Sequence, residues 1–259
     1  MKHILLAFLA IIFSVNLFAQ NNDKITISGQ VADFAGNPID GSVVQLKNKD
    51  FSTAYETYSD NTGHYVLEAV AKGQYIAMFA MRIEEYPRSN AVSYEDMRLE
   101  FWAWNVIADK DLTINPRYHR LELYGFRVFE VTGGCPYLMA YVRPMSLGKH
   151  LTYEKEVVLN KEQAEKIADI SVDLKDIEFK LYAADEPLTI RSVQPLVEYC
   201  GETNLSPTGF FLQFDRPQNF SGDKYCVFKI EAIHNAFGGE MGENLYFYEL
   251  KDYTNNTSH

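Results

Sequence analysis

Two histidines and a glutamate offer the ligand types of a zinc site. His119 and Glu122 form a His-x-x-Glu pattern, and His234 follows much later in the chain. Imidazole and carboxylate groups are common zinc ligands. The segment from His119 to Thr132, however, has the alternation that predicts a β-strand. Residues three positions apart point to opposite faces of a strand, so His119 and Glu122 could not reach one ion. The sequence therefore predicts no metal site.

Other arrangements of reactive residues are incomplete. The chain lacks a Gly-x-Ser-x-Gly nucleophile elbow and a phosphate-binding loop. The run Asp60-Asn61-Thr62-Gly63 supplies one carboxylate and no later acidic ligand, so it predicts a tight turn rather than a calcium loop. In the second half only Glu122, Asp215 and His234 are candidates for hydrolysis, and nothing in the sequence brings them together. We expect no enzyme activity and no cofactor.

Both tryptophans of the chain lie close together. Trp102 and Trp104 are two positions apart and therefore share one strand face, and they follow a polar stretch that contains Tyr86 and Tyr94. Indole and phenol rings offer flat apolar faces on which a sugar ring can stack. These four aromatic residues are the candidate ligand-binding residues. The alternative is that the tryptophans pack in a sandwich core or at the interface with a second domain.

Three cysteines lie in the second half of the chain. Cys200 and Cys226 each border an apolar run and could form one disulfide in an oxidising compartment, which would leave Cys135 unpaired. Three thiols without a bridge are the alternative.

The N-terminus has the pattern of a secretory signal peptide. Lys2 and His3 precede ten consecutive apolar residues, Ile4–Phe13, and small Ala19 closes the segment. We expect residues 1–19 to be removed and the chain to be exported. No later segment approaches the roughly 18 apolar residues of a membrane span, so no span is expected after cleavage.

The composition is that of packed domains with an acidic surface. Hydrophobic residues make up 47% of the 259 residues, and the formal net charge is −11. A nucleic-acid backbone or an anionic membrane rewards clusters of Lys and Arg, so the acidic balance argues against both partners.

The elements that would position these residues are mainly strands. Most apolar segments are short, rich in Val, Ile, Phe and Tyr, and bounded by turn-forming residues, which predicts an all-β protein built of sandwiches. A strand is predicted at Tyr153–Leu159. One short helix is predicted at 160–166, where Asn160 and Gln163 resemble a capping box. Arg82–Arg98 shows no alternation and is predicted to be a long loop.

The first part of the chain resembles a known family. The chain reads SGQVADFAGNPIDG from Ser28 to Gly41 and SDNTGHYVLEAVAKGQY from Ser59 to Tyr75. The positions that carry the likeness are Gly29, Val31, Asp33, Gly36, Pro38, Gly41, Asp60, Gly63, Tyr65, Gly73 and Tyr75. Through them, residues of about 24–115 resemble the carboxypeptidase regulatory-like domain. The resemblance implies a seven-stranded transthyretin-like β-sandwich, found in exported bacterial proteins as an accessory domain that is not itself catalytic.

The expected organisation has two domains after the signal peptide. The boundary is placed at Asn115-Pro116, which predicts the resembling sandwich at residues 20–115 and a second β-rich, sandwich-like domain with the one short helix at residues 116–259. We expect a non-catalytic interaction or scaffold module of the periplasm, outer membrane or cell surface, with an envelope or outer-membrane protein as partner. The alternative is a carbohydrate-binding protein that uses its exposed aromatics on a glycan.

Limited proteolysis tests the two-domain layout. The first cuts are expected within Arg82–Arg98 or near Pro116, because long polar loops and linkers present their backbone to a protease. Mass spectrometry of the early fragments identifies the cuts. Resistance at both places equal to that of the rest of the chain would count against the layout.

Overall fold

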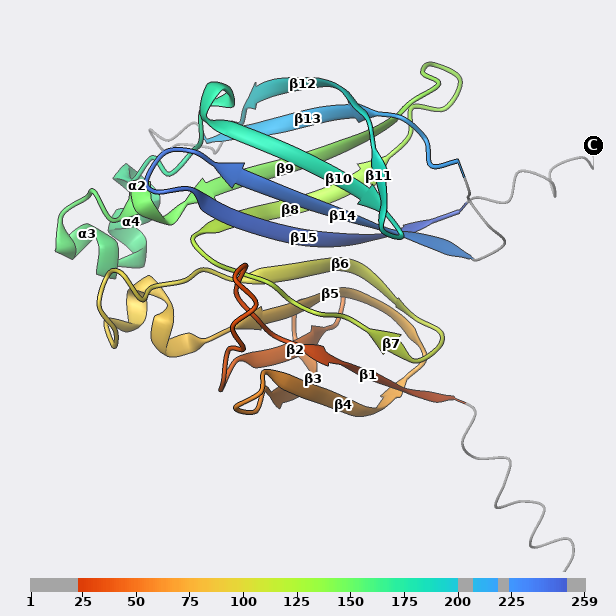
Figure 1. Ribbon diagram of the computed structural model, residues 1–259, viewed down its shortest axis with the longest axis horizontal. Helices are drawn as coiled ribbons and strands as arrows, with labels where there is room; N and C mark the ends of the chain where they lie inside the picture. The colour runs from red at the N-terminus through yellow and green to blue at the C-terminus, as the bar shows by residue number, and fades with distance from the viewer. Residues whose placement is uncertain (1–22, 200–206, 219–223, 251–259) are drawn as a thin grey trace, which may run out of the picture.

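The protein consists of two β-sandwiches joined along one sheet (Figure 1). The computed structural model describes residues 23–199, 207–218 and 224–250. Strands dominate throughout, so the prediction of an all-β fold is confirmed. The signal peptide predicted at residues 1–19 lies outside the described residues.

The first sandwich contains the seven strands that its resemblance implies. They are β1 (Lys24–Gln30), β2 (Val43–Lys47), β3 (Thr53–Tyr58), β4 (His64–Ala71), β5 (Gly73–Met81), β6 (Phe101–Ala108) and β7 (Leu112–Thr113). One sheet has the order β4-β1-β7 and faces the β6-β5-β2-β3 strands of the other. Ile27 from the first sheet and Phe101 and Met78 from the second are completely buried in the core between them.

Two glycines of the resembling segment have roles that other residues could not fill. Gly63 has a φ of 76°, and the neighbouring Asp60 carboxylate accepts hydrogen bonds from the backbone N–H groups of Thr62 and His64, at 2.8 and 3.0 Å. This is the predicted tight turn. A Cβ on Gly29 would lie 1.8 Å from the carbonyl oxygen of Ile114, so only glycine lets β1 approach the end of β7.

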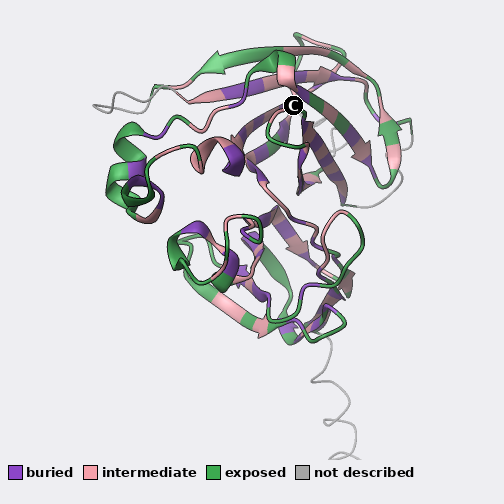
Figure 2. Cartoon of the chain, turned by 60° about the vertical axis from the view of Figure 1, so that its left-hand side comes forward, coloured by how far each residue is buried: buried purple, intermediate pink, exposed green. Residues whose placement is uncertain are grey.

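The second sandwich uses the remaining strands. They are β8 (Leu121–Phe129), β9 (Leu138–Ser146), β10 (Ile177–Ala183), β11 (Glu186–Leu188), β12 (Ile190–Val197), β13 (Thr208–Phe214), β14 (Tyr225–His234) and β15 (Glu240–Glu249). A four-stranded sheet of order β12-β13-β9-β8 packs on the β11-β10-β14-β15 strands, and Phe210, Phe214 and Phe228 fill the core between them. Figure 2 shows the buried residues concentrated on the strands of both sandwiches.

The two sandwiches share an eight-stranded sheet. β15 pairs in parallel with β6, with Asn244 opposite Trp102 and Tyr246 opposite Trp104, and the sheet order becomes β11-β10-β14-β15-β6-β5-β2-β3. The predicted boundary at Asn115-Pro116 lies where the chain passes from one sandwich to the other. Pro116 is buried there, and its carbonyl accepts a hydrogen bond of 3.0 Å from the backbone N–H of Ala32.

Asn244 connects the three strands that meet at this joint. It is fully buried on β15; its Oδ1 accepts a hydrogen bond from the backbone N–H of Trp102 on β6, and its Nδ2 donates to the carbonyl oxygen of Leu123 on β8. Close by, a Cβ on Gly242 would lie 2.3 Å from the carbonyl oxygen of Leu121. β8 therefore lies directly over the junction of β15 and β6.

The prediction of a single helix is incomplete. The predicted helix is α4 (Lys161–Ile167), and the Asn160 side chain caps it by accepting a hydrogen bond of 3.1 Å from the backbone N–H of Gln163. Two further helices are α2 (Leu147–His150) and α3 (Lys155–Leu159). The predicted strand at Tyr153–Leu159 is wrong. Val157 and Val158 are buried and lie in a helical turn. The backbone N–H groups of both valines donate to the carbonyl oxygen of Glu154, so they need no hydrogen-bond partner on a neighbouring strand.

The long loop at Arg82–Arg98 is confirmed and closes on itself. The loop contains the short 3₁₀ helices η1 (Ile83–Glu85) and η2 (Pro87–Ser89). Outside the loop, a third 3₁₀ helix, η3 (Leu174–Asp176), precedes β10. The buried Glu85 carboxylate forms ion pairs with Arg98 at 2.5 Å and with Arg82 at 3.5 Å.

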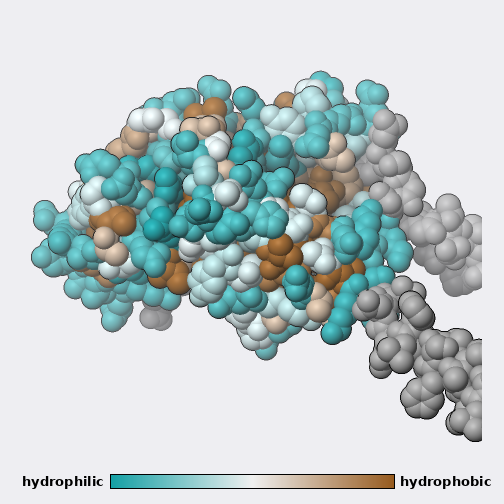
Figure 3. Space-filling view, turned by 60° about the horizontal axis from the view of Figure 1, so that its bottom comes forward, coloured by the Kyte–Doolittle hydropathy of each residue, from teal (hydrophilic) through white to brown (hydrophobic). Residues whose placement is uncertain are grey.

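The outer surface is mixed. Figure 3, seen from the side of the first sandwich, shows a mainly hydrophilic face on which hydrophobic patches lie between polar residues. In the part of the chain that the structure describes, no helix is long and apolar enough to cross a membrane.

The Asn244 link can be tested by a stability measurement. Asn244→Leu leaves the Trp102 N–H and the Leu123 carbonyl without their partners in a buried joint, so we expect the free energy of unfolding to fall by about 2–4 kcal/mol. Urea denaturation of the purified protein measures the change. Asn235→Leu, an exposed position between β14 and β15, is the matched control. A loss for Asn244→Leu no larger than that of the control would show that the link contributes nothing.

Candidate functional site

Trp102 and Trp104 share one face of β6, as their spacing predicts, and this face meets the second sandwich. The two indole rings stack with centroids 4.9 Å apart and planes 14° apart. The ring centroids of Phe79 and Trp102 lie 4.7 Å apart. Tyr124 of β8 packs edge-on against Trp104, with ring centroids 5.8 Å apart. Both tryptophans are half-buried. The faces of the two indole rings are therefore largely covered by each other and by neighbouring aromatic side chains.

The two predicted tyrosines lie apart from the tryptophans. Tyr86 and Tyr94 pack in a small apolar cluster with Met97, Leu99 and Leu147, formed by the long loop and α2. Tyr86 also lines a cavity, whereas Tyr94 is not among the residues that line it. The four residues predicted for ligand binding thus do not form one continuous platform.

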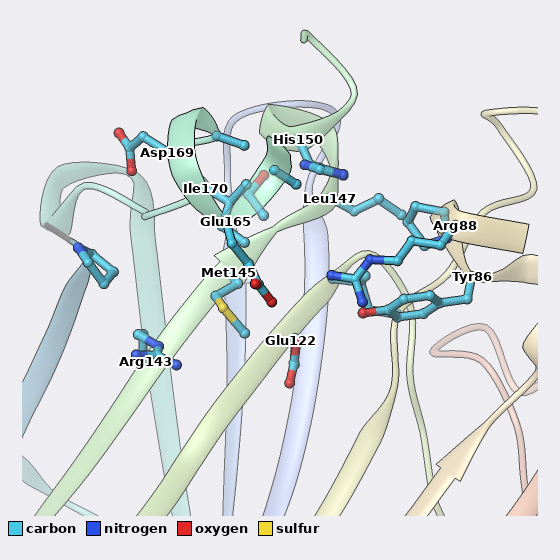
Figure 4. A pocket seen from close by; sticks show the side chains of 16 residues that line it. Tyr86, Arg88, Glu122, Arg143, Met145, Leu147, His150, Glu165, Asp169 and Ile170 are labelled. Carbon is cyan, nitrogen blue, oxygen red and sulfur yellow. The ribbon is translucent and has the colours of Figure 1, made fainter. Parts of the chain in front are cut away.

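The cavity that Tyr86 lines has a volume of about 470 Å³ and lies at one end of the joint (Figure 4). We call it the joint cavity. Its walls come from the long loop, from β8 and β9, from the helical segment and from Pro207. The lining residues are Tyr86, Pro87, Arg88, Leu99, Glu122, Arg143, Met145, Ser146, Leu147, His150, Ala164, Glu165, Ala168, Asp169, Ile170 and Pro207. Apolar walls with a few converging polar groups are typical of small-molecule sites.

The carboxyl group of Glu122 forms the floor of the joint cavity, and that of Glu100 lies beneath it. Alternation places Glu100 on the face of Trp102 and Glu122 on the face of Tyr124, so the joint brings the two carboxyl groups into a hydrogen bond with each other. Glu122 is buried and lines the cavity, while Glu100 is half-buried with its Oε2 shielded from solvent. Figure 4 shows Glu122 at the base of the cavity.

The pair holds at least one proton near neutral pH. Burial raises the pKa of Glu100 to about 7, although the charge of Arg88 and the indole of Trp102 act in the opposite direction. Burial, followed by the charge of Glu100, raises the pKa of Glu122 well above its ordinary value, against the influence of Arg143. Two such carboxyl groups in contact cannot both ionise without a cation between them. The floor therefore offers both a hydrogen-bond donor and acceptors.

Two arginines stand on opposite sides of this floor (Figure 4). Arg88 is exposed on η2, where its guanidinium lies 5.5 Å from the ring centre of Tyr86. Arg143 on β9 donates to Glu198 at 2.6 Å and lies 4.9 Å from the ring centre of Tyr124. The Nε of Arg143 is buried without a hydrogen-bond partner among the described residues.

A buried network holds the α2 wall of the cavity in place. Glu240 accepts hydrogen bonds from the Ser146 hydroxyl and the Gly148 backbone N–H, each at 2.5 Å, and it contacts His234 Nδ1 at 2.9 Å. Ser146 in turn caps α2 by accepting from the backbone N–H of Lys149 at 3.0 Å. This fixes His150, at the end of α2, on the cavity wall, where burial and the charge of Arg88 lower its pKa.

Sequence reasoning missed most of this site. The sequence predicts Glu122 only as a neighbour of His119 and as a candidate for hydrolysis, and it predicts no binding role for Glu100, Arg143 or His150. The spacing Glu100-x-Trp102 could have placed an acid on the tryptophan face. No local pattern could have shown that β8 covers that face.

The predicted disulfide stays a prediction, because Cys200 lies outside the described residues. Its proposed partner, Cys226, is half-buried on β14, where burial, with a smaller contribution from the charge of Glu186, raises the thiol pKa to about 11. The sulfur of Cys135 lies 3.1 Å from the side-chain amide nitrogen of Gln213.

A protein-family model matches part of the first sandwich. Residues 26–82 match the family model of the carboxypeptidase regulatory-like domain, as the resemblance predicted. No curated protein matches the chain.

Similar solved structures share little more than sandwich architecture. A "putative carbohydrate binding protein" from Bacteroides uniformis is 12% identical, with 88% of this chain and 100% of that chain covered and a TM-score of 0.29. A DUF3823 family protein from Bacteroides ovatus is 8% identical, with coverages of 88% and 97% and a TM-score of 0.24. The major pilin subunit BcpA of Bacillus cereus is 6% identical, with coverages of 87% and 69% and a TM-score of 0.25. At these scores the likeness carries no argument about ligands.

The carboxyl pair predicts a pH dependence of stability. Glu100 binds its proton more tightly in the folded protein than at its ordinary pKa of 4.5, so its stabilisation is complete below that pH and is lost as the pH rises through about 7. Between about pH 5 and about pH 8 we expect the free energy of unfolding to fall by roughly 1–3 kcal/mol from this group.

Urea denaturation across this range measures the effect in the wild-type protein and in Glu100→Gln, which should show a flatter profile. Glu84→Gln, on the exposed side of η1, should keep the wild-type profile. Parallel profiles for wild type and Glu100→Gln would contradict the assignment.

Proposed function

We propose that the protein is an exported, non-catalytic binding module of the bacterial envelope or cell surface, and that its ligand site is the joint cavity. The observation that carries this proposal is the convergence of Glu122, Arg143 and His150 on an apolar cavity of about 470 Å³. The volume lies within the range of roughly 300–1,000 Å³ that small-molecule sites occupy.

The geometry of the acids does not suit glycoside hydrolysis. Glycoside hydrolysis needs two carboxyl groups at least about 5 Å apart, and those of Glu100 and Glu122 bond to each other directly. The other candidates for hydrolysis are dispersed. Asp215 is paired with Arg191 at the surface, at 2.6 and 2.8 Å, and His234 is buried against Glu240.

The outer surface gives weaker support to any one docking face. Exposed apolar residues such as Phe51, Val131 and Phe237 belong to different turns, and Figure 3 shows hydrophobic patches separated by hydrophilic residues. Scattered apolar residues of this kind are normal on protein surfaces. Likewise, a sugar platform on Trp102 and Trp104 has less support than the cavity, since their ring faces contact each other and Phe79.

Site-specific photo-cross-linking tests the proposal. A benzophenone side chain replacing Glu165, whose carboxylate points into the cavity (Figure 4), would contact the ligand directly. The same group replacing Glu162 on the outer side of α4 is the matched control. In intact cells of the source organism we expect a defined covalent adduct from position 165 that is absent from position 162. Identical labelling at both positions, or none at 165, would overturn the cavity as the ligand site.

A further inference from the structure

Polar atoms without partners gather around the joint cavity. Among the residues that line the cavity, Arg143 Nε and His150 Nδ1 are buried and lack a hydrogen-bond partner among the described residues. Glu100 and Trp102 contact each other and the floor residue Glu122. Buried polar atoms are nearly always paired in native proteins, so such a group of unpaired atoms indicates a site for a polar ligand or for water.

These atoms include both donors and acceptors. The Nε–H group of Arg143 donates, and the carboxyl oxygens of the floor residue Glu122 accept. The lowered pKa of His150 keeps its ring neutral, and its Nε2 lies 3.4 Å from the carbonyl oxygen of Val158, to which it donates, so the unpaired Nδ1 accepts. A ligand that satisfies this set must itself donate and accept at several points. Hydroxyl groups do both.

Charged ligands fit the cavity less well. An ammonium group would lie between the guanidinium groups of Arg88 and Arg143, which stand on opposite sides of the floor (Figure 4). A carboxylate or phosphate group would face the carboxylate of Glu165. Each case brings like charges together in a partly desolvated site, which is unfavourable. A ligand without net charge avoids both conflicts.

The walls require an apolar surface on the same ligand. Leu147, Met145 and Ile170 face the cavity together with the ring of Tyr86. A sugar ring combines hydroxyl groups at its edge with an apolar C–H face that packs on aliphatic and aromatic side chains. Its chemistry matches both the unpaired polar atoms and the apolar walls.

We propose that the joint cavity binds a neutral saccharide, whose hydroxyl groups bond to Glu122, Arg143 and His150 and whose apolar face packs against Tyr86 and Leu147. This rests on the proposed function and gives its ligand a chemical class. The site differs from the aromatic platform predicted from the sequence, because Trp102 acts only beneath the floor and Trp104 does not line the cavity.

Titration with neutral oligosaccharides tests this inference. The probes are gluco-, xylo-, manno-, galacto- and chito-oligosaccharides, and isothermal titration calorimetry measures binding. Tryptophan fluorescence gives a second readout, because both tryptophans of the chain lie at the joint. We expect saturable binding of at least one series by the full mature protein.

Three variants locate the binding. Glu165→Phe fills the cavity from an exposed position and should weaken binding about tenfold or more, while Glu162→Phe on the same helix should change it less than about twofold. His150→Phe keeps the wall apolar but removes the ring nitrogens, so it should weaken a saccharide about fivefold or more. An apolar ligand would not lose affinity in this variant.

The outcomes separate this inference from the proposed function. Saccharide binding that Glu165→Phe leaves intact would place the sugar elsewhere and overturn the inference. Absence of binding across all series, together with a specific adduct from the photo-cross-linker at position 165, would show a ligand of another class; the proposed function would stand and this inference would fall. Absence of both would overturn both.

Discussion

The side-chain amide of Asn244 holds the two sandwiches against each other. By bonding to a backbone N–H of β6 and a backbone carbonyl of β8, it fixes two strands that face one another across the joint. The pairing of β15 with β6 supplies the continuous sheet, and the Asn244 amide sets how β8 lies over it. Glu100 meets Glu122 and Trp104 meets Tyr124 because these two strands are held in this relation. The joint cavity lies at the end of this packing of β8 on β6, where Glu122 lines it.

This arrangement costs stability at the place where it creates a site. Two carboxyl groups that contact each other in a buried joint are unfavourable unless they keep a proton, and apolar residues of similar size would pack there more easily. The nearby guanidinium groups of Arg88 and Arg143 reduce this cost without forming an ion pair with either acid among the described residues. Strongly perturbed acids in a cavity are common at functional sites, which fits a role in recognition better than a role in packing.

Local features were predictable from the sequence, and long-range contacts were not. Asp60 and Gly63 determine a turn by their own chemistry, Asn160 caps the helix that follows it, and alternation places Trp102 and Trp104 together. By contrast, the bond from Asn244 to Trp102 spans 142 positions, and no periodicity encodes which strand edges meet. The helix α3 was missed for a related reason. Its two valines favour a strand locally, but the segment packs against α4 and η2 and not against a sheet.

The shared sheet also determines the order in which the molecule can be completed. β6 belongs to the first sandwich, but its neighbour on one side is β15, the last described strand. The backbone groups on that edge of β6 therefore stay unpaired until β15 has been added to the sheet. Until then β6 presents open backbone groups beside two indole rings, a combination prone to pairing with another chain. A protein assembled in this way needs its last described strand to complete its first sandwich, and an interrupted chain would leave the edge of β6 open to pairing with another chain.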